Sequence, residues 1–134
     1  MNLQEQQVEL QIQKGIRQAE DDLVLWIQAA LDTTQYGNLE ESQFRNLVRV
    51  ADTTDSAEVI KNFIRYQVGR DKKWGRGKGS LAERIIQDID GNIKKNAQSI
   101  AESSQGELKQ VWLELIRRYL GYGSRHLKYL KDGK

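Results

Sequence analysis

Apolar residues recur every three or four positions along most of the chain, which is the spacing of one face of an α-helix. Polar breaks and glycines divide this pattern into about five helices and a last short one, at 3–32, 40–51, 55–69, 80–102, 108–120 and 124–130. No proline is present to interrupt a helix. The pattern therefore predicts an all-α fold, a bundle of about five helices without strands, in a single domain spanning 1–134.

Several helix ends carry specific expectations. Ser80 opens S-L-A-E, the clearest helix start in the sequence. Gly91 is a candidate for a kink, the glycines of 121–123 are expected to stop the fifth helix, and the tail at 130–134 is expected to be disordered. The first helix begins almost at Met1 with no clear capping sequence in front of it. Either this end frays, or the chain is the terminal segment of a longer polypeptide that is made separately.

A strongly basic, glycine-rich loop, RDKKWGRGKGS, lies between the third and fourth predicted helices at 70–80. Its single acid, Asp71, is outnumbered by five cations: Arg70, Lys72, Lys73, Arg76 and Lys78. Each of its three glycines costs about 1 kcal/mol relative to alanine in a helix, so a stable helix is not expected. Positive charge, a pliable backbone and the flat ring of Trp74 suit a nucleic-acid strand, whose phosphates meet the cations while its bases stack on the ring.

Two interpretations of this loop remain open. In the first, the loop is exposed and mobile, Trp74 stacks on bases, and the leading amides of the helix that begins at Ser80 hold a phosphate. In the second, the loop is a solvated linker and Trp74 folds back onto the bundle as an anchor. The loop lacks the Walker A spacing G-x-x-x-x-G-K-[ST], so nucleotide hydrolysis is not expected.

The net charge of +2 conceals a split between the two halves of the chain. Residues 1–58 carry four cations and eleven acids, a net −7, whereas 59–134 carry seventeen cations and eight acids, a net +9. This asymmetry suggests that part of the surface meets a polyanion, unless folding interleaves the halves and averages the field. Besides the loop, the predicted nucleic-acid contacts are Lys61 and Arg65 on one outward helix face, Arg84, and the C-terminal cations Arg117, Arg118, Arg125 and Lys128, with Tyr122 and Tyr129 interleaved.

Residues suited to catalysis or metal binding are scarce. His126 is the single histidine, expected to be exposed, and there is no cysteine, so neither a zinc site nor a catalytic thiol is expected. Neighbouring acids such as Glu40 and Glu41 point about 100° apart on a helix and do not form a preformed pair. We expect no enzyme, no metal and no cofactor. With no apolar run near the roughly 20 residues of a membrane span and no signal-peptide pattern, we expect no membrane association and a cytoplasmic location.

A small helical bundle of mixed charge, with a basic loop between helices and the sequence R-R-Y-L-G-Y near its end, resembles the small subunit of CRISPR interference (Cascade-like) complexes. The resemblance implies a non-catalytic subunit, present in several copies, that contacts the backbone of the guide and target or the displaced single strand of DNA. In some of these systems the subunit is the separately made C-terminal part of the large subunit, which fits a start at Met1.

The partners expected on this interpretation are nucleic acid, other subunits of the complex, and further copies of this chain. Head-to-tail copies could pair the acidic first half of one with the basic second half of the next. The sequence leaves DNA and RNA as open alternatives. A second hypothesis is a helical protein–protein interaction module without nucleic-acid binding, and an enzyme would need a cluster of carboxylates that the sequence does not reveal.

Overall fold

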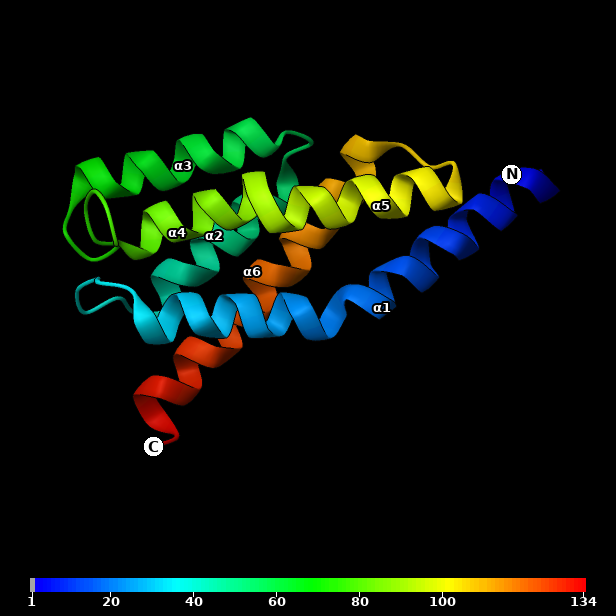
Figure 1. Ribbon diagram of the computed structural model, residues 1–134. Helices are drawn as coiled ribbons and strands as arrows, with labels where there is room; N and C mark the ends of the chain where they lie inside the picture. The colour runs from blue at the N-terminus through cyan, green and yellow to red at the C-terminus, as the bar shows by residue number, and fades with distance from the viewer. Residues whose placement is uncertain (1) are drawn as a thin grey trace.

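The computed structural model describes residues 2–134, which form helices and no strand. The helical elements are α1 (Leu3–Thr33), α2 (Glu41–Thr53), α3 (Ala57–Arg70), α4 (Leu81–Asp88), the π-helical turn η1 (Ile89–Ile93), α5 (Lys94–Ser104) and α6 (Leu108–Asp132). Because α4, η1 and α5 follow one another without a break, the chain folds as five rods (Figure 1). The predicted all-α bundle of about five helices, with the glycine-rich loop between α3 and α4, is confirmed.

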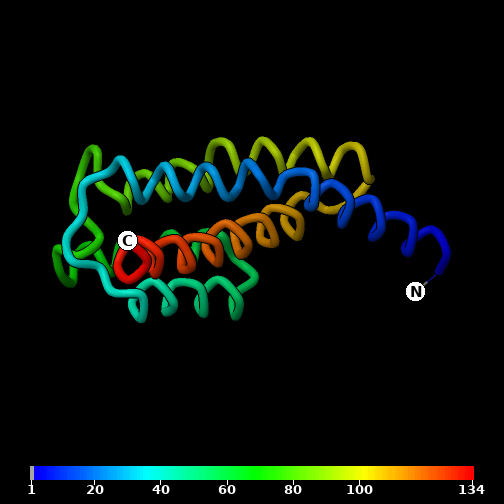
Figure 2. The backbone as a smooth tube through the Cα atoms, turned by 90° about the horizontal axis from the view of Figure 1, so that it is seen from below, coloured from blue at the N-terminus to red at the C-terminus, as the bar shows by residue number. Residues whose placement is uncertain are grey.

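Helix α6 lies at the centre of the bundle. Helix α1 and the α4–α5 rod run side by side as one layer, α6 crosses beneath both, and α2 lies on the far side of α6 (Figure 2). Helix α3 packs on α2 and α4 at the other edge (Figure 1). Because α6 is covered on several sides, its side chains Leu115, Ile116, Tyr119 and Leu120 are fully buried.

The glycines near the end of α6 do not stop the helix, so the prediction of a break at 121–123 and a separate last helix is wrong. Helix α6 continues to Asp132, which also contradicts a disordered tail beginning at 130. Gly123 is there for close packing: a Cβ atom on it would lie 2.7 Å from Phe44 Cζ and 2.7 Å from Ile27 Cγ1. The missing side chain allows α6 to approach α1 and α2, which outweighs the low helix propensity of glycine.

The first helix does have a cap, contrary to the sequence-based expectation. Asn2 precedes α1, and its side-chain Oδ1 accepts a hydrogen bond of 2.8 Å from the backbone amide of Glu5. The predicted start at Ser80 is confirmed, since its hydroxyl accepts from the amide of Glu83 at 3.2 Å. An asparagine cap was missed because it stands so close to the first residue of the sequence.

The candidate kink at Gly91 is present as a π-helical turn. At this turn the carbonyl of Ile89 accepts a hydrogen bond of 2.8 Å from the indole Nε1 of Trp112 on α6. The ammonium of Lys94, one residue beyond the turn, lies 4.8 Å from the centre of the Trp112 ring. The irregular turn thus gives α6 a polar anchor on the α4–α5 rod.

The two glycines of α6 form a matched pair for testing the packing argument. We expect Gly123→Ala to lower the free energy of unfolding by about 1–3 kcal/mol, because the added methyl group overpacks against Phe44 and Ile27. Gly121 has no atom within 4 Å of the corresponding position, so Gly121→Ala should be neutral or stabilising by up to about 1 kcal/mol. Urea denaturation followed by circular dichroism measures both; equal effects would contradict a packing role for Gly123.

Candidate nucleic-acid interface

The basic loop has a defined course and is not a loose linker. Gly75, Gly77 and Gly79 have φ angles of 78°, 72° and 85°, in the left-handed region that favours glycine. The alternation of glycine with cations therefore serves the shape of the loop and leaves the cations at its surface.

Backbone hydrogen bonds tie this loop to the 34–40 segment that joins α1 to α2. The amide of Gly37 donates to the carbonyl of Lys73 at 3.1 Å, and the amide of Gln35 donates to the carbonyl of Gly79 at 3.0 Å. A Cβ atom on Gly75 would collide with the carbonyl oxygen of Gln35, so the two segments also pack closely here. These contacts hold the loop against the end of the bundle.

Trp74 is not a stacking surface for bases, and its predicted role in nucleic-acid binding is wrong. The side chain is completely buried, and its ring lies 5.6 Å from the ring of Phe44 at an interplanar angle of 28°. A large apolar side chain in a polar loop gains more from burial than from exposure. The second interpretation of the loop, with Trp74 as an anchor, is the correct one for this residue.

The start of α4 is also unavailable to a phosphate. The amide of Leu81 donates to the carbonyl of Gln35 at 3.1 Å, and the amide of Ala82 donates to the carbonyl of Trp74 at 3.1 Å. The next two amides bond to the hydroxyl and carbonyl of Ser80. All four leading amides therefore have partners within the chain, and the predicted phosphate site at this helix end is wrong.

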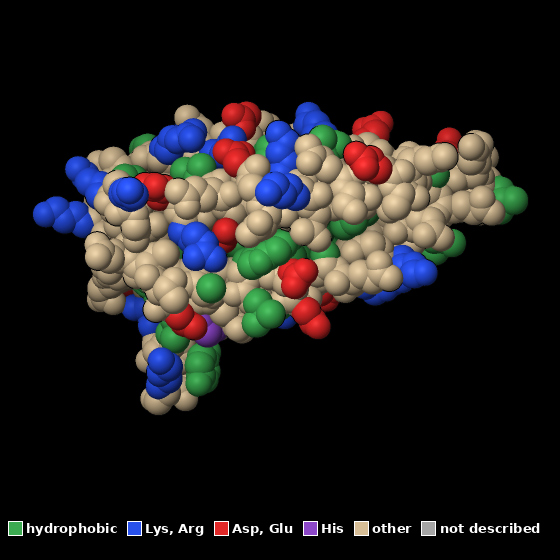
Figure 3. Space-filling model, viewed as in Figure 1, with side chains coloured by type: hydrophobic (Ala, Val, Ile, Leu, Met, Phe, Trp, Pro, Cys, Tyr) green, Lys and Arg blue, Asp and Glu red, His purple; other side chains and the backbone are tan. Residues whose placement is uncertain are grey.

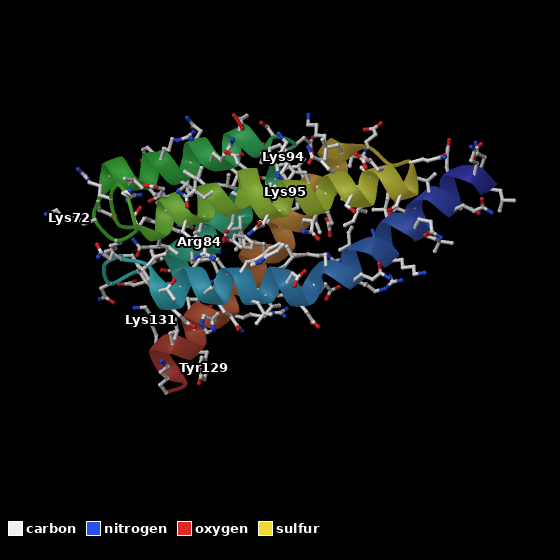
Figure 4. The ribbon with its side chains drawn as sticks, in the orientation of Figure 1. Lys72, Arg84, Lys94, Lys95, Tyr129 and Lys131 are labelled. Atoms are coloured by element: carbon white, nitrogen blue, oxygen red, sulfur yellow. The ribbon has the colours of Figure 1, made fainter. Side chains whose placement is uncertain are left out.

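Six of the predicted cations nevertheless gather at one end of the molecule, and we call them the basic end: Arg65, Arg70, Lys72, Lys73, Arg76 and Lys78. None of them takes part in an ion pair found among residues 2–134. Figure 4 places Lys72 at the end of the bundle opposite the start of α1, and basic side chains project from that end in the space-filling view (Figure 3). Arg76 folds back so that its Nη2 donates to the carbonyl of Val68 at 3.2 Å.

The acid within the loop forms no ion pair with these cations among residues 2–134. Asp71 Oδ1 accepts a hydrogen bond of 2.8 Å from the backbone amide of Lys73, which directs the carboxylate toward the loop backbone. The basic end therefore presents a run of cations on a hydrogen-bonded backbone, an arrangement that attracts phosphate groups without reading bases.

Lys61 does not share an outward face with Arg65, so the prediction of a common exposed face for these two residues is wrong. It is 6% exposed, and its Nζ lies 2.9 Å from Asp90 Oδ1 on η1 and also pairs with Glu58. The α4–α5 rod covers this side of α3, which the periodicity of α3 alone does not reveal. Lys61 joins two helices, whereas Arg65 remains exposed.

Arg84 belongs to a polar cluster that reaches into the bundle; its side chain stays partly exposed, and its nucleic-acid contact remains a prediction. Its Nε lies 3.1 Å from Asp88 Oδ1, and the hydroxyl of Tyr119 donates to Asp88 Oδ2 at 2.7 Å. Asp88 is 4% exposed, so these two partners compensate its burial. Burial, then the charge and hydrogen bond of Asp88, raise the pKa of Tyr119 well above its ordinary value, and the nearby Arg84 opposes them in part.

Arg117 and Arg118 also serve the fold; both side chains stay partly exposed, and their nucleic-acid contacts remain a prediction. Arg117 donates from Nε to the carbonyl of Ala51 and from Nη2 to the carbonyl of Thr54, both at 2.8 Å, at the end of α2. Arg118 pairs with Glu20 on α1 at 3.1 Å and with Glu114 at 3.0 Å. Both arginines therefore fasten α6 to its neighbours.

The remaining C-terminal residues, Lys128, Arg125 and His126, differ in the contacts that they make. Lys128 pairs with Asp132 at 2.6 Å on the exposed surface, whereas Arg125 makes no ion pair among the described residues and lies over the ring of Tyr122, 5.9 Å from its centre. His126, expected to be exposed, is largely covered and its Nε2 lies 2.8 Å from Asp32 Oδ1.

Lys131 lies next to the basic end, although it was absent from the predicted contacts. Its Nζ donates to Asn38 Oδ1 at 2.8 Å, and the adjacent Gly37 is bonded to Lys73. The 34–40 segment thus brings the end of α6 beside the basic loop. No sequence signal joins residues 38 and 131, because the link exists only once both segments have folded.

Comparison with known proteins identifies no relative: no family model, curated protein or solved structure matches this chain. Within residues 2–134 no three or more metal-binding side chains come together, and no helix is both long and apolar enough to cross a membrane. Evidence on function therefore comes from the geometry of the chain's own residues.

The buried Tyr119–Asp88 contact predicts a specific loss of stability in alkaline solution. Since the folded state raises the pKa of Tyr119, the contribution of this residue is fully present below the ordinary value of 10.0 and declines as the pH rises toward the folded pKa. In urea titrations above pH 10, the free energy of unfolding of the wild type should fall more steeply than that of Tyr119→Phe, by up to about 1.4 kcal/mol per pH unit. Identical slopes for the two proteins would contradict the prediction.

Replacing Arg117 should affect mainly the stability of the fold, whereas replacing Arg65 should affect mainly nucleic-acid affinity. Arg117→Ala leaves two carbonyls at the end of α2 without their partner, so we expect the free energy of unfolding to fall by about 1–3 kcal/mol. Arg65→Ala, on an exposed surface, should change it by less than about 0.5 kcal/mol. Nucleic-acid affinity should fall more in Arg65→Ala than in Arg117→Ala. A loss of affinity confined to Arg117→Ala would contradict the assignment of Arg65, and not Arg117, to the interface.

Proposed function

We propose that this chain is a non-catalytic, nucleic-acid-binding small subunit of a CRISPR ribonucleoprotein effector complex, and that its basic end contacts backbone phosphates. The observation that carries the proposal is that six cations gather at the basic end and that none of them is ion-paired within residues 2–134. Elsewhere in these residues, carboxylate partners are found at Arg45, Lys61, Arg84, Arg117, Arg118 and Lys128. Cations without carboxylate partners retain their attraction for phosphate, since no internal pair competes with it.

The backbone contacts of the basic loop favour this role. Holding Lys72 and Lys73 on a segment bonded to residues 35–37 reduces the freedom that the loop would lose on binding. Lysine and arginine recognise phosphate irrespective of sequence, which suits a subunit that must accept any guide or target. Whether DNA or RNA is bound depends on sugar contacts, so both are tested below.

The proposal also includes the assembly of several copies of the chain in a cytoplasmic complex. The first turns of α1 project beyond the bundle (Figure 1). Leu3 and Leu10, seven residues apart and hence on one helix face, are 71% and 67% exposed, and Glu5 and Glu9 are exposed on other faces of the same turns. An exposed helix end that carries apolar and acidic side chains suits contact with another subunit or with a basic surface of the next copy.

The same projecting surface favours the second candidate function, a helical protein–protein interaction module without nucleic-acid binding. The two candidates differ in what the basic end does. In the module, its cations would only keep the chain soluble or meet an acidic protein.

The decisive experiment is fluorescence anisotropy of labelled single-stranded DNA, duplex DNA and RNA, titrated with the protein at several salt concentrations. We expect the logarithm of the association constant for a single strand to fall with the logarithm of the salt concentration with a slope on the order of −3 to −4, for about five phosphate contacts. The variant Lys72→Ala/Lys73→Ala/Arg76→Ala/Lys78→Ala should lose most of the affinity and of that slope.

A second variant provides a control with the same loss of charge. Lys14, Arg17, Lys95 and Lys109 have no ion-pair partner among the described residues and lie away from the basic end. Changing these four to alanine should leave most of the slope intact. Equal losses in both variants would indicate a diffuse charge effect, and absence of wild-type binding at low salt would leave the interaction module as the better explanation.

A further inference from the structure

Burial of Trp74 leaves the basic end without the aromatic surface that the sequence offered, but another one lies close by. A groove of about 550 Å³ opens where α1 passes the last turns of α6. It is lined by Val24, Gln28, Tyr122, Arg125, His126 and Tyr129. Tyr129 is 53% exposed, and Figure 4 shows its side chain on the projecting end of α6.

Polar contacts hold the rings of Tyr122 and His126 in this groove, and Tyr129 packs on the second of them. The hydroxyl of Tyr122 donates to Glu20 Oε2 at 3.1 Å, and the guanidinium of Arg125 lies 5.9 Å from the centre of the same ring. The rings of His126 and Tyr129 lie 5.9 Å apart at an angle of 31°, with His126 held by Asp32. Rings positioned in advance lose little freedom when a flat ligand packs against them.

Arg125 gives the groove a cation for an anionic ligand that also has a flat apolar face, and it makes no ion pair within residues 2–134. No lining residue is a carboxylate, although Glu20 and Asp32 border the groove through their bonds to Tyr122 and His126. Through Asn38, Lys131 links the last turn of α6 to the segment that holds the basic loop. Lys72, Lys131 and Tyr129 accordingly lie at the same end of the molecule (Figure 4).

We propose that this groove takes an unpaired base of the single strand whose phosphates contact the basic end, with Tyr129 as the stacking ring and Arg125 near the adjoining phosphate. The inference rests on the proposed function and adds a base-stacking site to it. A base within a duplex is already stacked on both faces, so the groove selects single strands. Stacking is available to every base, which keeps the recognition independent of sequence.

The test compares a fifteen-residue oligo(dT) with an abasic deoxyribose-phosphate strand of the same length, by anisotropy at fixed salt, with oligo(U) as a parallel probe. The wild type should bind oligo(dT) or oligo(U) about tenfold more tightly than the abasic strand. Tyr129→Ala should abolish this preference and leave abasic binding and the salt slope unchanged. Tyr129→Phe, which keeps the ring, should retain the preference.

Tyr66→Ala is the matched control, since Tyr66 is similarly exposed, at 59%, but lies on α3 outside the groove. Equal wild-type binding of the base-containing and abasic strands, or loss of the preference in Tyr66→Ala and not in Tyr129→Ala, would overturn the groove site. In either case a steep salt slope would leave the proposed function standing. Absence of binding to every strand at low salt would overturn both.

Discussion

Phe44 is the side chain on which two distant parts of the chain converge. It stacks on Trp74 from the basic loop, and on α6 it fills the space left by the missing side chain of Gly123. The first contact fixes the loop that carries the cations, and the second fixes the central helix. The position of the basic end relative to the bundle therefore depends on a buried aromatic contact and not on the charges themselves.

The cations of this chain divide into those that build the fold and those that remain available. Lys61, Arg84, Arg117 and Arg118 each bond to a carboxylate or carbonyl, and Lys61, Arg117 and Arg118 join separate helices. Part of this was present in the sequence: Arg84 with Asp88 and Arg118 with Glu114 stand four residues apart, the spacing of helical ion pairs. The carbonyl partners of Arg117 lie more than sixty positions away, and no local pattern reveals them.

The helices themselves were predictable because their apolar spacing extends over many residues, and errors arose where one residue type has two uses. Glycine in 70–80 marks a loop with positive φ angles, whereas Gly123 allows two helices to approach within a continuous helix. Tryptophan can stack on a ligand or anchor a loop, and burial decides for Trp74. In each case tertiary packing determines the outcome, which is information that a local pattern does not contain.

The split between an acidic first half and a basic second half is only partly removed by folding. Glu20 meets Arg118 and Asp55 lies 3.9 Å from Arg117, so the halves do partly neutralise one another along α6. Within residues 2–134 the loop at 70–80 receives no such partner, because the 34–40 segment facing it supplies backbone groups and no ion pair. Folding thus concentrates the excess positive charge at one end, while Glu5 and Glu9 stay exposed at the other. In the proposed complex, the strongly basic end would give each copy a direction along a nucleic-acid strand.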